Sequence, residues 1–167
     1  MRKSTLISFG LVGFLATALL AFAQDAGPQP SQINIDVRDY CDPTSFNAAL
    51  GSVGAWRFVP NQIRAHEGAT LNLQNLGGET HTFTRVKRFG GGFVSVLNFL
   101  PPAPECAQMV NGSLVPQPPS PDNLFIPAGT TAGATLHPGE VARFQCCIHP
   151  WMRVTVTPKD EQHTELH

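Results

Sequence analysis

A stretch near the carboxyl end, residues 146–152 with the sequence CCIHPWM, places the strongest constraint on what this chain can fold into. It brings a thiol, an imidazole and a thioether together, because Cys146, His149 and Met152 fall at positions i, i+3 and i+6. A tight loop with this spacing can direct all three side chains at one centre. Soft sulfur ligands beside an imidazole suit copper and suit calcium or magnesium poorly. A mononuclear copper site of this type needs a second histidine, so the stretch predicts a partner loop elsewhere in the chain.

The partner histidine is His81, which ends the stretch NLGGETH at residues 75–81. Together the two stretches resemble the ligand loops of the cupredoxins, the small type 1 blue copper proteins, and the second is most like that of amicyanin and plastocyanin. The alternating strand that follows the second loop, residues 153–156, agrees with this resemblance. The resemblance covers residues 56–86 and 130–158, and it does not cover the much longer connection between them.

The resemblance implies one type 1 copper ion per chain, bound by His81, Cys146 and His149 with Met152 as a weak axial ligand. It also implies that Asn75, in the second shell, ties the two ligand loops together by hydrogen bonds. The implied fold is all-β, a cupredoxin-like antiparallel β-sandwich of Greek-key type. The 15 glycines and 15 prolines of the chain agree with a β domain that is rich in turns.

The choice between the two adjacent cysteines rests on spacing and on strand alternation. Cys146 gives the Cys-x-x-His spacing of a blue copper loop, whereas Cys147 would leave only one residue before the histidine. Alternation along a strand places Cys146 on the same face as Phe144 and places Cys147 on the opposite face. The alternative is that both are buried thiols or disulfide partners without a metal, since cysteine is often buried for packing alone.

Three cysteines remain once Cys146 is assigned to the metal, and an odd number leaves at least one thiol unpaired within the chain. We expect a disulfide between Cys41 and Cys106 that anchors the long connection to the amino-terminal segment. A bridge that uses Cys147 is the alternative. Disulfides persist in exported proteins, and the amino terminus indicates that this protein is exported.

The amino terminus has the pattern of a secretory signal peptide. Basic residues at positions 2 and 3 precede an apolar core over residues 6–22, which ends in an Ala-Phe-Ala cleavage site at residues 21–23. We expect residues 1–23 to be removed and the protein to be exported, either periplasmic or extracellular. A transmembrane anchor is the alternative, which the short core disfavours. No other stretch is long and apolar enough to span a bilayer, so the processed protein is not expected to be an integral membrane protein.

The rest of the chain predicts one domain with short extensions. Residues 24–32 are rich in proline, glycine and glutamine and predict a flexible leader. From residue 33 apolar and polar residues alternate, which predicts a first β-strand. We expect the cupredoxin domain that the resemblance implies to cover residues 33–158. Within it, residues 89–127 are predicted to form a long proline-rich insertion, because prolines cannot join the middle of a sheet. Residues 159–167 are expected to be a polar tail.

The predicted ligand set favours electron transfer over catalysis. Four protein ligands leave no open position for a substrate, whereas a catalytic metal site keeps one. We therefore expect a carrier of single electrons that cycles between Cu(I) and Cu(II), and not an enzyme. Redox protein partners are expected to dock near His149, Pro150 and Trp151, because the resemblance places the ring edge of that ligand histidine at the surface.

Several other functions have to be weighed against an electron carrier. The net charge of −1 becomes more negative when the basic amino-terminal segment is removed, which argues against a nucleic-acid partner. We also expect the protein to be a monomer. A periplasmic copper-binding or delivery protein would use the same ligands but exchange the metal readily. The chain could also be the electron-transfer part of a larger copper enzyme system. A purely structural β-sandwich would make the ligand spacing a coincidence.

Overall fold

The computed structural model describes the chain from residue 31 to residue 159 with short gaps. The described segments are 31–39, 46–47, 52–53, 56–98, 100–137 and 139–159. The predicted signal peptide, most of the leader and tail, and Cys41 lie outside the described residues. Among the described residues, no helix has the length and the apolar character needed to cross a membrane.

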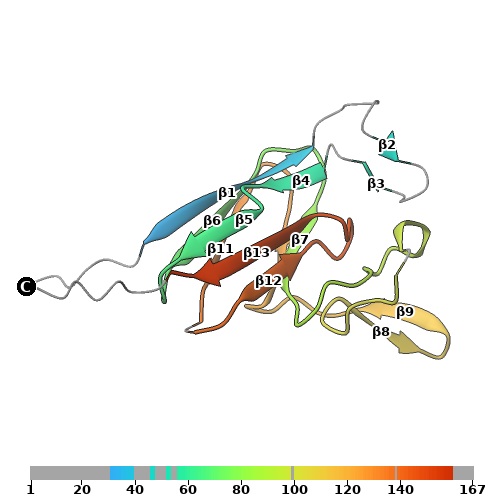
Figure 1. Ribbon diagram of the computed structural model, residues 1–167. Helices are drawn as coiled ribbons and strands as arrows, with labels where there is room; N and C mark the ends of the chain where they lie inside the picture. The colour runs from blue at the N-terminus through green and yellow to red at the C-terminus, as the bar shows by residue number, and fades with distance from the viewer. Residues whose placement is uncertain are drawn as a thin grey trace, which may run out of the picture.

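A four-stranded sheet forms one layer of the protein (Figure 1). Its spatial order is β11-β6-β1-β4, from strands β1 (Gln32–Asp39), β4 (Trp56–Val59), β6 (Thr70–Asn75) and β11 (Thr131–Thr135). β1 and β6 run parallel, while the β1–β4 and β6–β11 pairs are antiparallel. The layer is therefore a mixed sheet.

A five-stranded sheet forms the second layer and carries the carboxyl-terminal part of the chain. Its order is β10-β7-β12-β13-β5, from β5 (Gln62–Ala65), β7 (His81–Arg85), β10 (Asn123–Ile126), β12 (Ala142–Gln145) and β13 (Arg153–Pro158). β13 and β5 are parallel and the other neighbours are antiparallel. The predicted all-β sandwich is confirmed, with the correction that each of its two sheets contains one parallel pair.

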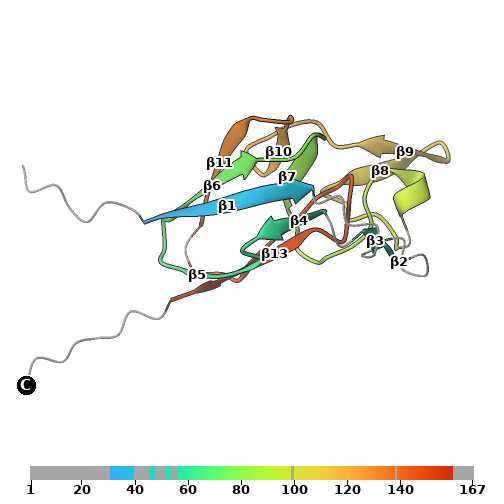
Figure 2. The same ribbon diagram turned by 90° about the horizontal axis from the view of Figure 1, so that it is seen from above.

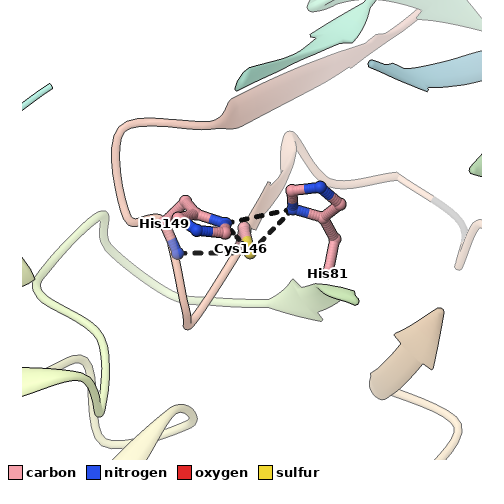
Figure 3. A group of neighbouring side chains, drawn as sticks. All are labelled: His81, Cys146 and His149. Atoms are coloured by element: carbon pink, nitrogen blue, oxygen red, sulfur yellow. Dashed lines mark hydrogen bonds between the residues drawn. The ribbon is translucent and has the colours of Figure 1, made fainter. Parts of the chain in front are cut away.

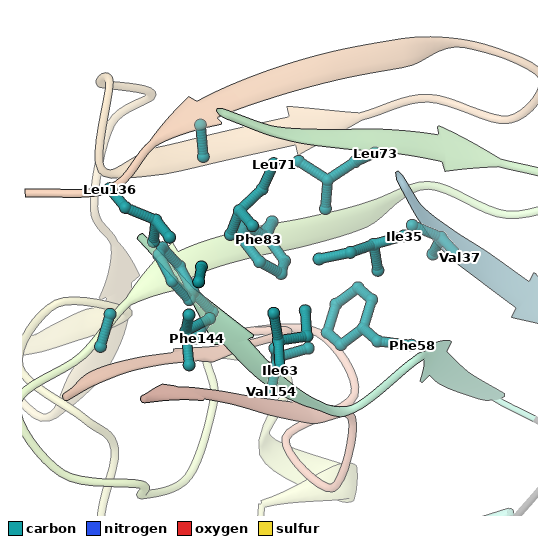
Figure 4. Close-up of a cluster of buried hydrophobic side chains, with 14 of the residues drawn as sticks. Ile35, Val37, Phe58, Ile63, Leu71, Leu73, Phe83, Leu136, Phe144 and Val154 are labelled. Atoms are coloured by element: carbon teal, nitrogen blue, oxygen red, sulfur yellow. The ribbon is translucent and has the colours of Figure 1, made fainter. Parts of the chain in front are cut away.

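The main hydrophobic core lies between the two sheets, as Figure 4 shows. Strand alternation sends Ile35 and Val37 of β1 and Leu71 and Leu73 of β6 into this core, because every second side chain points to the same face. Three phenylalanines, one on β4 of the first sheet and two on β7 and β12 of the second, continue the core across both layers. Phe58 meets Phe83 edge to face at 5.2 Å between centroids, and Phe83 stacks on Phe144 at 4.3 Å. Aromatic pairs in these arrangements add to the free energy of burial.

The region between β7 and β10 forms a separate lobe beside the sandwich. It contains the 3-10 helix η2 (Ser95–Leu97) and a hairpin of β8 (Ala107–Val110) and β9 (Ser113–Pro116). The hairpin extends to one side of the two sheets in both views (Figures 1 and 2). Asn111 and Gly112 have φ angles of 50° and 80°, the left-handed conformation that a two-residue Asn-Gly hairpin turn requires. A further short pair, β2 (Phe46–Asn47) and β3 (Ser52–Val53), precedes β4.

The structure revises the predicted insertion at its carboxyl end. β10 falls inside the range 89–127, yet it pairs with β7 as the edge strand of the five-stranded sheet. The segment apart from the sandwich therefore ends before β10. An edge position requires hydrogen bonds on one side only, which lets a short strand join the sheet directly after a proline-rich run.

A disulfide attaches this lobe to the end of β12. Cys106 bonds to Cys147, and both cysteines are buried in a second, smaller cluster with Val86 and Ala103. The expected Cys41–Cys106 pairing is therefore wrong, and the alternative that uses Cys147 is the one observed. A Cβ on Gly92 would lie 1.9 Å from the Cys147 carbonyl oxygen, so only glycine permits this close approach of the lobe.

Candidate metal centre

Three side chains from two separate stretches meet at one end of the core. His81 is the first residue of β7, Cys146 directly follows β12, and His149 lies in the loop between β12 and β13 (Figure 3). His81 Nδ1 lies 3.8 Å from Cys146 Sγ and 3.1 Å from His149 Nδ1. The third separation, from Cys146 Sγ to His149 Nδ1, is 3.9 Å. All three residues are buried, so one sulfur and two imidazole nitrogens surround a single point.

Backbone hydrogen bonds fold the loop from Cys146 to Met152 back on itself. The Cys146 N–H donates to the Met152 carbonyl oxygen at 3.0 Å, and the Met152 N–H donates to the His149 carbonyl oxygen at 2.9 Å. The Cys146 sulfur accepts from the His149 N–H at 3.3 Å and from the Thr82 N–H at 3.4 Å. Hydrogen bonds to a ligand sulfur are one of the means by which proteins tune a copper site.

The two histidines favour the thiolate form of Cys146. Burial raises the pKa of this thiol, but hydrogen bonds with His149 and His81 outweigh burial and lower the pKa from 9.0 to about 6. Burial lowers the pKa of His81, but Cys146 and Asp39 outweigh it, and the pKa is raised above 6.5. A metal ion must displace protons from its ligands, and the lowered pKa of Cys146 makes the loss of its proton easier.

Asp39 is a member of the site that sequence reasoning missed. Its Oδ1 lies 2.7 Å from His81 Nε2, the ring nitrogen that faces away from the cluster. Asp39 ends β1 in the other sheet, 42 residues before His81, so no local spacing links the two. A carboxylate on the outer nitrogen of a ligand histidine is a common arrangement in metal sites, because it fixes the orientation of the ring.

His149 is enclosed by aromatic side chains. Trp56 stacks on the ring at 4.4 Å between centroids, and the Trp151 ring lies 5.5 Å away. The Glu79 carboxylate lies 3.5 Å from His149 Nε2. His149 is only 3 % exposed and Pro150 is buried, so the expected exposed edge of this histidine is not observed. Trp56 and Trp151, whose rings contact His149, are both partly exposed.

The side chain of Asn75 organises the first ligand loop. It accepts a hydrogen bond from the Gly77 N–H at 2.9 Å and donates to the carbonyl oxygens of Glu79 at 2.7 Å and Ile126 at 2.9 Å. These bonds hold the approach to His81 against β10.

Thr82, which follows His81 on β7, makes two further bonds to the second ligand stretch. Its N–H reaches the Cys146 sulfur, and its Oγ1 accepts from the Cys147 N–H at 2.6 Å. The described bonds of Asn75 reach its own loop and β10, whereas those of Thr82 reach Cys146 and Cys147.

Met152 is buried in the main core and closes the loop through its backbone. Its role as a fourth ligand remains a prediction from the sequence. The three residues that the structure brings together already form a donor set of one thiolate and two imidazoles, which fits a copper or zinc ion and fits magnesium or calcium poorly. The cluster can thus hold one metal ion.

No protein-family model and no curated protein matches the chain. Solved structures similar to it include a purple cupredoxin from Nitrosopumilus maritimus, with 16% identity, a TM-score of 0.44, and coverage of 76% of this chain and 99% of that one. A variant of amicyanin in its reduced Cu(I) form has 12% identity and a TM-score of 0.42, over 80% of this chain and 88% of that one. Oxidized plastocyanin from Dryopteris crassirhizoma has 19% identity and a TM-score of 0.39, over 75% and 99%.

Proposed function

We propose that this chain is an exported type 1 copper protein that carries single electrons between redox partners. The observation that carries the proposal is the buried cluster of His81 Nδ1, Cys146 Sγ and His149 Nδ1. Copper bound there would supply the one-electron couple between Cu(I) and Cu(II), for which a thiolate and two imidazoles are suitable ligands. Met152, on the same loop, is proposed as the weak axial ligand.

The surrounding hydrogen bonds support electron transfer because they restrict movement of the ligands. Cys146 is held by two N–H groups on its sulfur, and His81 is held by Asp39 on its outer nitrogen. A protein that loses or gains an electron without moving its ligands has a small reorganisation barrier. A core packed from both sheets excludes water and gives the ligands little room to rearrange.

The electron is proposed to pass between the cluster and a partner through the aromatic side chains over His149. Trp56 stacks on this imidazole, and Trp151 is tilted against both rings. Partners are proposed to dock at the face formed by Trp56 and Trp151, with His149 and Pro150 beneath it. The proposed docking region is still the one near His149, Pro150 and Trp151, but the partner is proposed to contact Trp56 in place of the edge of His149.

Export of the protein is supported by the disulfide. Cys106 and Cys147 form a buried disulfide, and such bonds persist mainly in oxidising compartments outside the cytosol. We propose that residues 1–23 are a cleaved signal peptide and that the domain at 33–158 is the exported unit, followed by a polar tail at 159–167. Burial of all three ligands favours retention of the metal over the ready exchange that a delivery protein needs.

The first test is addition of Cu(II) to the purified, metal-free protein while the visible absorption spectrum is recorded. We expect an intense thiolate-to-copper band that saturates at one copper per chain, is bleached by ascorbate and returns with an oxidant. Copper that binds without a visible band would favour storage or delivery. A protein that binds no copper would contradict the proposal altogether.

A further inference from the structure

Asp39 uses both of its carboxylate oxygens inside the first ligand loop. Oδ1 lies 2.7 Å from His81 Nε2, and Oδ2 accepts hydrogen bonds from the N–H groups of Gly78 at 2.8 Å and Glu79 at 3.1 Å. The side chain is only 12% exposed. A mostly buried carboxylate that has three polar partners is a fixed negative charge at a defined place.

The loop sequence is shaped around this carboxylate. A Cβ placed on Gly77 would lie 2.2 Å from the Asp39 Cγ, so any side chain at this position would expel the carboxylate. The glycine allows the loop backbone to approach Asp39 closely enough to donate two N–H groups. Gly77 and Asp39, which are far apart in the sequence, therefore determine together how the loop packs on the carboxylate. Asp39 contacts the loop backbone as well as the His81 ring.

The contact also decides which nitrogen of His81 is available to a metal. A carboxylate only accepts hydrogen bonds, so Nε2 must carry the proton in the contact with Asp39. The lone pair of the neutral ring is then on Nδ1, the atom that faces Cys146 and His149. A hydrogen bond from Nε2–H to an anion makes the other nitrogen a stronger donor to a metal.

We propose that Asp39 is a positioning residue that holds His81 Nδ1 toward the metal and lowers the reduction potential of the copper bound there. The proposal rests on the proposed function, because it concerns the same centre. Its physical basis is that a fixed negative charge and a more basic imidazole stabilise Cu(II) more than Cu(I). Removal of that charge should therefore make Cu(I) relatively more stable and raise the potential.

The decisive comparison is between Asp39→Asn and Asp36→Asn. Both variants remove one carboxylate from β1, but Asp36 pairs with Arg38 and has no described contact with a ligand histidine. If Asp39→Asn weakens the preference for Cu(II) over Cu(I) tenfold, the reduction potential rises by about 59 mV. Asp36→Asn should leave the potential at the wild-type value. Equal potentials for wild type, Asp39→Asn and Asp36→Asn would overturn the proposal.

A second measurement does not depend on copper chemistry. In the Zn(II)-loaded protein, NMR should show the His81 Nε2 proton exchanging slowly with solvent in wild type and in Asp36→Asn. In Asp39→Ala this exchange should accelerate, and Zn(II) affinity should fall by about 10–100-fold, as is typical when a partner of a ligand histidine is removed. Unchanged exchange and affinity would contradict the positioning role. Lack of a thiolate-to-copper band in wild type would instead refute the proposed function and leave this test of Asp39 intact.

Discussion

Two adjacent cysteines, Cys146 and Cys147, have different roles in the sandwich and in the lobe beside it. Cys146 faces the main core, where its sulfur meets two histidines and forms no disulfide. Cys147 faces the second cluster, where it bonds to Cys106 of the lobe. One residue along the chain changes the face, because side chains alternate in extended backbone. The loop that carries the metal ligands is thus anchored to the lobe by a disulfide at Cys147, the residue next to the ligand cysteine.

The same comparison shows that the lobe contributes no side chain to the metal cluster. All three residues of the cluster come from the sandwich or the loop between its strands, and none comes from the lobe. The lobe contributes to the centre indirectly, through the disulfide and through the Phe93 N–H, which donates to the Cys147 carbonyl oxygen at 2.9 Å. We therefore expect changes at Cys146 to alter chemistry and changes at Cys147 to alter stability.

The largest expected effect separates the two cysteines by their spectra. Cys146→Ser should abolish the thiolate-to-copper band, because it removes the sulfur of the described cluster. A protein carrying Cys106→Ala and Cys147→Ala together should keep the band, and the double change avoids creating a competing free thiol. Visible absorption of the copper-loaded variants checks both results. A band that persists in Cys146→Ser and is lost in the double variant would reverse the assignment of the two cysteines.

The second expected effect is on the free energy of unfolding. The disulfide closes a loop with a sequence separation of 41, and loss of such a cross-link costs roughly 4 kcal/mol through the entropy of the unfolded chain. Urea unfolding of the metal-free double alanine variant, compared with wild type, measures this loss. Cys146→Ser, in the same experiment, should be destabilised far less. Equal stability of the double variant and wild type would show that the lobe is held by its packing alone.

The smallest of these effects concerns Thr82, which bonds to both cysteines. Thr82→Val keeps the shape of the side chain but removes the Oγ1 that accepts from the buried Cys147 N–H. An unpaired buried N–H costs about 1–3 kcal/mol, so the unfolding free energy should fall by that amount. The copper band should remain, because the Thr82 N–H that reaches the Cys146 sulfur is a backbone group. Thr131→Val, an exposed position on β11, serves as the control and should change stability by less than about 0.5 kcal/mol.

The features that the sequence predicted correctly are those that depend on residues close together in the chain. The spacing of Cys146 and His149 in a short loop, together with alternation along β12, was sufficient to predict which cysteine faces the core. The resemblance of the two ligand stretches to cupredoxin loops implied the all-β sandwich, although the parallel pairs depend on which distant strands become neighbours. Local patterns are readable because the geometry of a strand or a tight loop follows from consecutive residues alone.

The parts that the sequence did not reveal depend on contacts between distant segments. The Cys106–Cys147 bond requires the lobe to fold back on the end of β12, and at a sequence separation of 41 no local pattern signals that contact. The same holds for Asp39 beside His81 and for Trp56 over His149. Gly77 is a local feature that reflects the carboxylate packed against it, but the reason for a glycine there is clear only from the structure.

X-ray absorption at the copper edge of the loaded protein, in its oxidised and its reduced form, tests the central claim most directly. The account predicts one short copper–sulfur distance and two copper–nitrogen distances, from Cys146, His81 and His149, with nearly the same first shell in both oxidation states. A first shell with two short sulfur neighbours, or one that loses a nitrogen on reduction, would contradict a rigid centre built for electron transfer.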